Sequence, residues 1–398
     1  MKNRQYWKGL ATGLLVSSVI FAAGILGYRN ADQSKGTVLE SSEHRAKIIA
    51  LEQLIDAYYL GEKDEEKLAD GMYKGLVSGL GDPFSRYYTA EEYSDESADS
   101  HGSYEGIGVS MTDAPDGGAL IVMCYEGGPA ERAGLLPGDI ISAINGTDCL
   151  TLTLEQISEM CRNSGGNSVE LTILRGEDSE ELLFDVPIEN VELLSVYGEM
   201  LEDHIGYIRI EEFKGVTARQ YSETYAMLAS QGMEKLIVDL RNNPGGYVSQ
   251  VCDVLREILP EGLIVYTEDK DGVREEERCD GAHYIGMPLA VLVNDKSASA
   301  AEIFAGAVQD YGIGTIIGEK TFGKGVVQSI RTFRDGSAVK LTNSHYYTPL
   351  GHDINGEGIT PDLEIQLEED VILASGQSHD NDTQLQAAVR VVSAQKVV

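Results

Sequence analysis

Residues 288–319, "PLAVLVNDKSASAAEIFAGAVQDYGIGTIIGE", carry the pattern that decides the fold. An apolar run opens the stretch, a segment with helical spacing follows, and a second apolar run closes it. Short apolar runs of this kind are typical of buried strands. Strand and helix patterns alternate in the same way from Asn190 onward, and such alternation favours an α/β domain with a mostly parallel sheet.

The other segments indicate a multidomain chain of class α/β plus α+β. From Tyr104 the periodicity becomes that of strands with two helices among them, which indicates a compact mixed unit. Ahead of it, apolar residues three and four positions apart predict a helical pair. The predicted divisions are a signal-anchor at 1–30, a linker and N-terminal helical region at 31–95, the mixed unit at 96–188, the α/β core at 189–366 and an acidic C-terminal tail at 367–398.

The first residues predict a membrane segment. Lys2, Arg4 and Lys8 precede an uncharged run, residues 9–28, that is just long enough to cross a bilayer as a helix. Positive charge ahead of such a run keeps the N-terminus in the cytoplasm. We therefore expect a single-pass protein of a bacterial-type cytoplasmic membrane with its body outside the cytoplasm, or a secreted protein if the run is a cleaved signal peptide.

Charge and cysteine content narrow the class of protein. Sixty-five acidic residues against 31 basic ones give a net charge of −34, which would repel nucleic acid, so no nucleic-acid partner is expected. The five cysteines are odd in number and widely spread, which does not suit a disulfide framework. No cluster of cysteines and histidines suggests a metal site, and we expect neither a metal nor a cofactor.

Ser299 stands where the first apolar run of the opening stretch gives way to the helical segment. Its hydroxyl could cap the helix by accepting a backbone N–H, which is the commoner role of a serine at such a place. It could also be a nucleophile, because the helix dipole there favours developing negative charge. The local pattern leaves both roles open.

Lys324 is a candidate base for such a nucleophile. It lies between Gly323 and Gly325, which allow the backbone to approach another segment closely. A strand pattern follows, so Lys324 and Gln328 would point to one face, with Gln328 holding the amine in place. Free lysine has a pKa of about 10.4 and a base near neutral pH needs about 7 to 8, a shift that desolvation can supply. A lysine between glycines is otherwise most often a surface loop residue.

An oxyanion site is predicted at the end of another strand. Residues 239–246, "DLRNNPGG", leave a buried strand and turn. Strand ends of a parallel sheet share one edge, where sites gather. The backbone N–H groups of Gly245 and Ala300 are therefore candidate donors to one oxygen. Taken alone, the glycine pair also fits a simple tight turn.

Five motifs together resemble the carboxy-terminal processing (tail-specific) serine protease family. Each is weak alone, and the set is specific. They span most of residues 44–366 and read "GDPFSRYYT" at 81–89, "DLRNNPGG" at 239–246, "SASAAE" at 297–302, "TFGKGVVQ" at 321–328 and "GITPD" at 358–362. Gly128 and Ala301 replace serines that are frequent in the family, and neither position carries the proposed chemistry.

The resemblance implies a role for each candidate residue. Ser299 resembles the nucleophile, Lys324 the general base and Gln328 the residue that positions the lysine. Gly245 and Ala300 resemble the backbone donors of the oxyanion site.

The mixed unit resembles the PDZ domain of the family. Its carboxylate-binding loop corresponds to Gly106, Ile107, Gly108 and Val109, where backbone N–H groups hold a chain terminus. In some relatives an arginine near the position of Arg175 joins substrate binding to assembly of the active site. A solvated surface arginine is the plainer interpretation of Arg175.

The resemblance thus implies a serine endopeptidase with a Ser–Lys mechanism that binds the C-termini of protein or peptide substrates through its PDZ domain and cleaves them outside the cytoplasmic membrane. The helical pair makes a homodimer the expected assembly. Two other classes are considered: a catalytically silent PDZ adaptor on a protease scaffold, and an anchored solute receptor. The intact Ser299, Lys324 and Gln328 argue against the adaptor, and nothing in the sequence supports the receptor.

Overall fold

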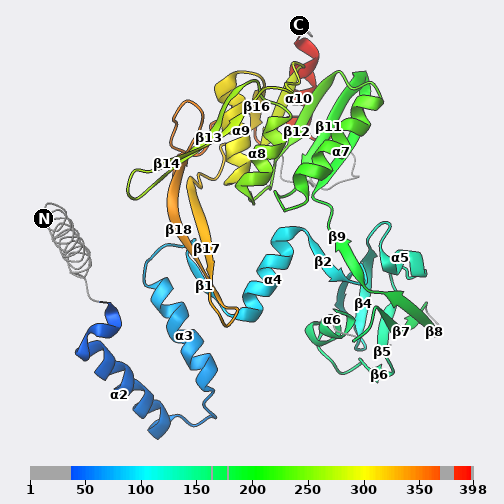
Figure 1. The fold of residues 1–398 in the computed structure, drawn as a ribbon. Helices are drawn as coiled ribbons and strands as arrows, with labels where there is room; N and C mark the ends of the chain where they lie inside the picture. The colour runs from blue at the N-terminus through cyan, green and yellow to red at the C-terminus, as the bar shows by residue number, and fades with distance from the viewer. Residues whose placement is uncertain (1–36, 163–164, 177–178, 368–380, 396–398) are drawn as a thin grey trace, which may run out of the picture. The chain divides into compact units, whose positions relative to one another are not determined.

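The computed structural model describes residues 37–162, 165–176, 179–367 and 381–395 (Figure 1). The predicted membrane segment at 1–30 lies outside these residues. Within them, no helix combines the length and the apolar character that crossing a bilayer requires. The chain forms two compact units, with the division after Tyr73.

The first unit confirms the two predicted N-terminal helices. Neither helix has a buried residue, and Leu51 and Leu54 are more than half exposed. The unit contains η2 (Val38–Glu40), α2 (Ser42–Tyr58) and the start of α3 (Glu65–Ser78). Apolar side chains at helical spacing are therefore left facing solvent in the single chain.

Helix α4 (Ala90–His101) follows the short strand β1 (Arg86–Tyr88) in the second unit. It begins at a capping box in which the side chains of Thr89 and Glu92 each accept the other's backbone N–H, at 3.2 and 3.0 Å. It ends at Gly102, whose φ of +72° is the left-handed conformation that favours glycine.

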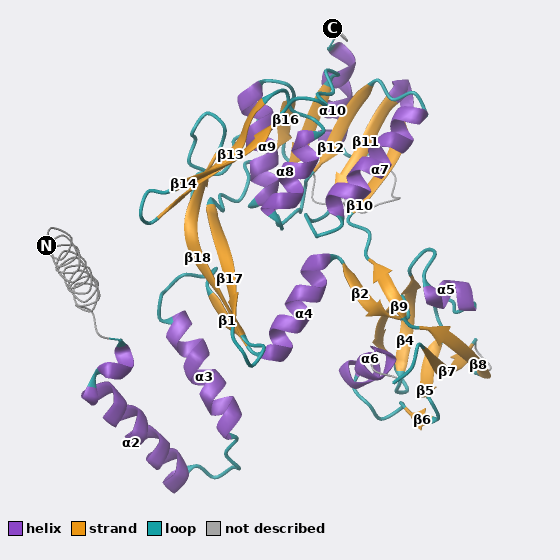
Figure 2. Cartoon of the chain, in the orientation of Figure 1, coloured by secondary structure: helices purple, strands orange, loops and turns teal. Residues whose placement is uncertain are grey.

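The middle domain, residues 103–192, is the predicted mixed unit (Figure 2). Its body is an antiparallel sheet of order β3-β4-β5-β7-β8, with β6 beside β5 and a core that includes Ile121 and Leu171. It extends past the predicted end at 188 because β9 pairs with β2. Its elements are β2 (Ser103–Gly106), β3 (Val109–Asp113), β4 (Ala119–Cys124), α5 (Pro129–Ala133), β5 (Ile140–Ile144), β6 (Thr147–Asp148), α6 (Leu154–Arg162), β7 (Ser168–Arg175), β8 (Glu180–Pro187) and β9 (Glu189–Glu192).

The α/β domain, residues 193–367 and 381–395, confirms the predicted mostly parallel sheet. The order is β10-β11-β12-β15-β16-β19, and only the pair β10–β11 is antiparallel. The opening stretch of the sequence forms β15, α9 and β16. The elements are β10 (Val196–Leu201), η3 (Glu202–His204), β11 (Ile205–Ile210), α7 (Thr217–Ser230), β12 (Lys235–Asp239), α8 (Val248–Arg256), β15 (Leu289–Val293), α9 (Ala300–Tyr311), β16 (Thr315–Gly318) and β19 (Leu363–Glu364).

Helix α10 (Thr383–Ala394) corrects the prediction of an acidic tail. Leu385, Ala388 and Val392 of α10 are buried against one set of side chains of the parallel sheet. The side chains that pack against α7, α8 and α9 alternate with this set along the strands. Helix α10 therefore covers the opposite face of the sheet. Burial of this apolar stripe stabilises the helix on the sheet, although the segment that precedes it is polar in composition.

A second sheet, antiparallel, stands beside the parallel one in the α/β domain (Figure 2). Its order is β1-β18-β13-β14, with β17 also paired to β18. Its remaining strands are β13 (Gly262–Asp269), β14 (Arg274–Cys279), β17 (Val326–Thr332) and β18 (Ala338–Tyr347). The loop that contains Lys324 connects β16 of the parallel sheet to β17 of this one.

Candidate active site

Ser299 is held in a strained conformation at the start of α9. Its φ of +55° and ψ of −116° lie in a region that side-chain-bearing residues rarely adopt. The loop ahead of it is fixed, because the hydroxyl of Ser297 donates to the carbonyl oxygen of Leu240 at 2.7 Å. Ser299 itself is 8% exposed. Strain of this kind at a pocket is common where a side chain must be presented for chemistry.

Gly245 packs directly against Ser299. A Cβ atom on Gly245 would lie 2.7 Å from the Cβ of Ser299 and 3.0 Å from the backbone N of Ala300, so only glycine fits. Its φ of +110° also favours glycine. The two strand ends predicted to form the site are therefore in contact.

The two predicted oxyanion donors differ in their hydrogen bonding. The N–H of Gly245 donates to Oδ1 of Asn243 at 2.8 Å, so it is engaged within its own turn. Ala300 is the first residue of α9, where backbone N–H groups have no intrahelical acceptor. In this structure the N–H of Ala300 is thus the better placed of the two to meet a substrate oxygen.

Ser299, Lys324 and Gln328 line one cavity of about 490 Å³. Helix α4 contributes Glu96 and Ser100 to its wall. The other lining residues are Glu212, Phe213, Pro244, Gly246, Tyr247, Val248, Ser249, Val326, Val327, Ile330, Lys340 and Tyr346. The predicted nucleophile, base and positioning residue are therefore brought together, from α9, the loop before β17, and β17 itself.

The surroundings of Lys324 lower the pKa of its amine. Burial is the largest cause, the positive charge of Lys340 adds to it, and the carboxylates of Asp82 and Glu302 oppose it. The amine lies 4.8 Å from the centroid of the Phe84 ring. Among the described residues no hydrogen bond joins this amine to the hydroxyl of Ser299. A lysine with a lowered pKa can act as a base once it reaches the serine.

Gln328 lies on the cavity wall and does not bind Lys324 in this structure. Its amide donates to the carbonyl oxygen of Val326 and to Oγ1 of Thr342, both at 3.3 Å. The strand begins only at Val326, and a register shift between Val327 and Gln328 interrupts the alternation on which the sequence argument relied.

Glu302 is a functional candidate that the sequence analysis missed. Its side chain is completely buried, and burial raises the pKa of its carboxyl group. One carboxylate oxygen accepts the N–H of Ser299 and that of Lys324, each at 2.8 Å. The other accepts the hydroxyl of Thr321 at 2.6 Å and the N–H of Gly323 at 2.7 Å. One carboxylate therefore ties the backbone of the serine to the backbone of the lysine loop.

Tyr346 is the second residue that was missed. Its hydroxyl donates to the carbonyl oxygen of Lys324. Burial raises the pKa of Tyr346 well above its usual range, and a hydrogen bond with the side chain of Ser299 opposes that effect. Tyr346 thus contacts both members of the candidate pair from β18. No local sequence signal marks either residue, because each acts through contacts formed only in the fold.

Replacing Glu302 by glutamine is expected to lower kcat by about 100-fold with a smaller change in KM. An amide nitrogen cannot accept the N–H groups that one carboxylate oxygen now holds, so the serine and the lysine loop would lose their common anchor, and displacements near 1 Å cost about this much. Steady-state kinetics on a peptide substrate would measure it, with the exposed Glu234→Gln as control. An unchanged kcat in a folded E302Q protein would show that the anchor does not matter.

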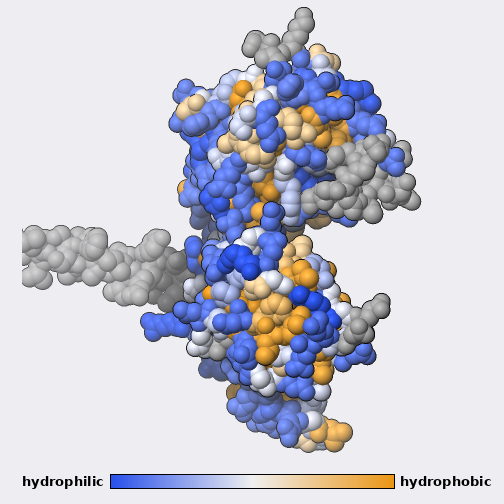
Figure 3. All heavy atoms as spheres, turned by 90° about the vertical axis from the view of Figure 1, so that its right-hand side faces the viewer, coloured by the Kyte–Doolittle hydropathy of each residue, from blue (hydrophilic) through white to orange (hydrophobic). Residues whose placement is uncertain are grey.

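The predicted carboxylate-binding loop lies apart from this cavity, in the middle domain. Gly106 ends β2, Val109 begins β3, and Ile107 between them is buried. Figure 3 shows apolar side chains gathered among polar ones on the surface of this part of the chain. Exposed apolar residues of the middle domain include Val122, Met123, Leu136 and Leu183.

Arg175 is bound within the middle domain. Its guanidinium donates to both carboxylate oxygens of Asp139, at 2.6 and 2.7 Å, and to the carbonyl oxygen of Gly134 at 2.9 Å. The ring of Phe184 lies 5.3 Å from it. These contacts give Arg175 a structural part in the middle domain of this structure, and it does not line the cavity of Ser299.

Three models of known protein families match parts of the chain. The model of peptidase family S41 matches residues 204–365, a PDZ domain model matches 123–175, and a model of the activating protease CtpB N-terminal domain matches 23–92. All three matches fall in the order of the predicted domains.

Two relatives show how far the similarity extends. The chain is 35% identical over 323 residues to the carboxyl-terminal-processing protease of Synechocystis sp. (strain ATCC 27184 / PCC 6803 / Kazusa), covering 80% of this chain and 75% of that protein. It is 35% identical over 320 residues to the carboxy-terminal processing protease CtpA of Bacillus subtilis (strain 168), covering 80% and 68%. Among solved structures, the photosystem II D1 C-terminal processing protease is 26% identical with a TM-score of 0.47, covering 86% of this chain and 92% of that one.

Proposed function

The chain belongs to the carboxyl-terminal processing serine proteases of peptidase family S41, and on that premise we propose that it cleaves its protein substrates by a Ser–Lys mechanism. Ser299 is the nucleophile and Lys324 the general base. The observation that carries the proposal is the shared cavity, in which the strained Ser299 and a lysine whose pKa is lowered by burial both lie.

The proposed reaction runs through an acyl-enzyme. The neutral amine of Lys324 takes the proton of the Ser299 hydroxyl as its oxygen attacks the peptide carbonyl. The N–H of Ala300 stabilises the resulting oxyanion, and that of Gly245 joins it when it leaves Asn243. The lysine then gives its proton to the departing amine. Water, deprotonated by the same lysine, releases the acyl group and restores the serine.

Other residues support this pair. Gln328 lines the cavity, and we assign it the role of holding the amine of Lys324 when its amide turns from Thr342. Glu302 fixes the two backbones from outside the cavity and is a positioning residue.

Substrate selection is assigned to the middle domain. A protein tail would add as a strand beside β3, with its terminal carboxylate at the loop of Gly106–Val109. The proposed divisions 1–30 and 31–95 remain, the middle domain ends at 192 instead of 188 because it includes β9, and α10 joins the protease core. Arg175, bound to Asp139, has no part in catalysis in this proposal.

The proposed setting is outside the cytoplasmic membrane, as a dimer anchored by the N-terminal segment. The uncharged run at 9–28 supports the anchor. The exposed apolar side chains of α2 and α3, among them Leu51, Leu54 and Leu76, support self-association, because a second copy would bury them. Sedimentation of the detergent-solubilised chain, with all three changed to serine as the comparison, would test the dimer.

A substrate with a free C-terminus is expected to be cleaved about ten times faster than the same polypeptide with an amidated C-terminus. The amide lacks the negative charge that a carboxylate-binding loop recognises, and a tenfold change corresponds to about 1.4 kcal/mol. Mass spectrometry of an unfolded casein-like substrate and its amidated form would give both rates. Equal rates would remove tail recognition from the proposal, and binding without any cleavage would favour the adaptor.

A further inference from the structure

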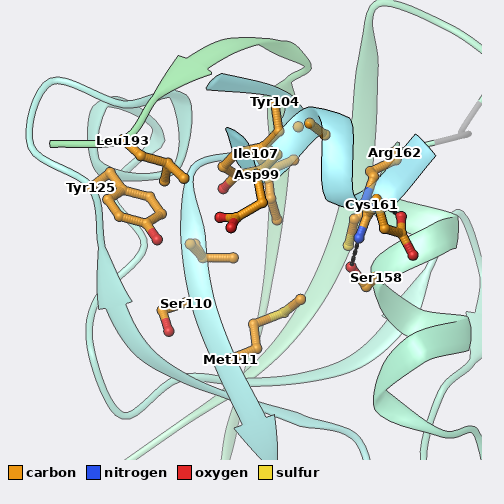
Figure 4. Close-up of a pocket in the computed structure, with 14 residues that line it drawn as sticks. Asp99, Tyr104, Ile107, Ser110, Met111, Tyr125, Ser158, Cys161, Arg162 and Leu193 are labelled. Atoms are coloured by element: carbon orange, nitrogen blue, oxygen red, sulfur yellow. Dashed lines mark hydrogen bonds and ion pairs between the residues drawn. The ribbon is translucent and has the colours of Figure 1, made fainter. Parts of the chain in front are cut away.

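The middle domain has a cavity of about 360 Å³ at the predicted carboxylate-binding loop (Figure 4). It is formed by the end of β2, the start of β3, and α6, and one side is covered by α4. The lining residues are Asp95, Ala98 and Asp99 of α4, Ser158, Cys161 and Arg162 of α6, and Tyr104, Gly106, Ile107, Val109, Ser110, Met111, Tyr125 and Leu193. A chain terminus entering here would meet groups from α4, from α6 and from the segment that joins β2 to β3.

Charge in this cavity is sparse and asymmetric. Arg162 is the single basic residue among those that line it, and Asp95 and Asp99 are the acidic ones. Asp99 is already neutralised from outside the cavity, by the amine of Lys214 at 2.6 Å. Asp95 faces the guanidinium of Arg162 at 3.7 Å, with both side chains about half exposed or more. One cation and one internal carboxylate are therefore paired across the cavity.

The phenol oxygen of Tyr104 also lies at this loop. The ring of Tyr104 packs on Gly106, where a Cβ atom would lie 2.6 Å from it. Burial raises the pKa of Tyr104 to about 12, and backbone hydrogen bonds from Val109 and Gly108 to its oxygen act in the opposite direction. A neutral phenol oxygen thus stands at the amides that would receive a carboxylate.

We propose that Arg162 is the residue that recognises the terminal carboxylate of a substrate tail, and that Asp95 occupies this position while no tail is bound. The inference rests on the proposed function of the middle domain and names the residue that binds the negative charge of the tail. The substrate carboxylate replaces Asp95 as the partner of Arg162, and α4 gives up its contact with α6.

The walls of the cavity specify the rest of the tail. Ile107 and Cys161 are each 3% exposed, and Met111 completes an apolar wall beside them. The last side chain of the tail is therefore apolar. Acidic side chains just upstream of it are disfavoured, because Asp95, once released, and the chain's net charge of −34 repel them. A substrate tail of this class ends in an uncharged apolar residue preceded by neutral or basic ones.

Binding of labelled peptides to the full chain tests this assignment without turnover. The protein carries Ser299→Ala in every case, and the probe is an eight-residue peptide ending in valine, as free acid and as amide, measured by fluorescence anisotropy. Arg162→Gln is expected to weaken binding of the free acid about fivefold and to leave the amide unchanged, because a partly exposed charge pair contributes modestly. Arg162→Lys keeps the charge and should keep most of the preference.

Asp95→Asn is the decisive companion variant. It removes the internal competitor, so the free acid should bind about threefold more tightly while the amide does not. Arg132→Gln is the control, because Arg132 pairs with Glu189 at 2.7 Å and does not line the cavity. If R162Q retains the full preference for the free acid, or D95N gains no affinity for it, Arg162 and Asp95 do not have these roles. If no protein distinguishes acid from amide, tail recognition itself fails.

Discussion

Replacing Ser299 by alanine is expected to lower kcat by about 10⁶-fold, to the level of residual background cleavage. The hydroxyl oxygen is the one protein atom that bonds to the substrate carbonyl in the proposed mechanism, so neither the lysine nor the oxyanion donors can compensate for its loss. The fold should be retained, because Glu302 accepts the backbone N–H of Ser299 at the helix start, and alanine keeps that hydrogen bond.

The measurement has two parts. Cleavage of a fluorogenic peptide gives kcat, and a serine-reactive fluorophosphonate followed by mass spectrometry locates the modified residue. Ser230→Ala, at an exposed position near the end of α7, should retain full activity and labelling. Substantial cleavage by S299A, or labelling of another serine, would remove Ser299 from the centre of the mechanism.

The parallel sheet and its crossover helices could be predicted because each depends on local pattern. The runs that became β12, β15 and β16 are short and apolar, and the intervening segments have helical spacing. The region of β13 shows the limit of this approach. Its sequence looks like another strand of the parallel sheet, yet it pairs with β14 and β18. Strand pairing is a contact between distant segments, and periodicity does not specify it.

The candidate site likewise contains some residues that local sequence patterns indicate and others that they do not. Ser299, Lys324 and Gly245 each stand beside a strand end or a glycine, and these local signals made them candidates from the sequence alone. Glu302 resembles an ordinary acidic residue in the first turn of a helix, although it is buried and holds four hydrogen-bond donors. Tyr346 is one of several aromatic residues in an alternating strand. Their importance comes from tertiary contacts, which a single sequence does not reveal.

The hydrogen bond of Gly245 shows a further limit. Its N–H is predicted to donate to the substrate oxygen, whereas in the structure it donates to Oδ1 of Asn243. Glycine at this turn was predictable from the need for close approach to another segment, and that approach is seen against Ser299. The acceptor of a particular N–H depends on side-chain rotamers, which the backbone pattern leaves open.

Replacing Lys324 by alanine is expected to reduce kcat/KM by about 10⁴-fold, the upper end of what a general base contributes. The serine hydroxyl remains, but the amine that takes its proton in the proposed mechanism is gone. Lys320→Ala is the matched control, since this exposed lysine lies in the same loop. Added primary amines should restore part of the activity of K324A if a missing amine is the defect. Full activity in K324A would assign the base to another residue.

The pH profile tests the same lysine without removing it. Only the neutral amine can accept a proton, so kcat/KM should rise with pH up to the lowered pKa of Lys324 and then level off. Lys340→Gln removes a positive charge that favours the neutral amine, so it should raise that pKa and move the rise to higher pH. Asp82→Asn removes a negative charge that favours the protonated form, so it should move the rise to lower pH; Glu302, the third charge acting on the lysine, is left in place. Shifts of opposite sign in these two variants are what a base at Lys324 requires, and a profile that moves with neither would assign the titration to another group.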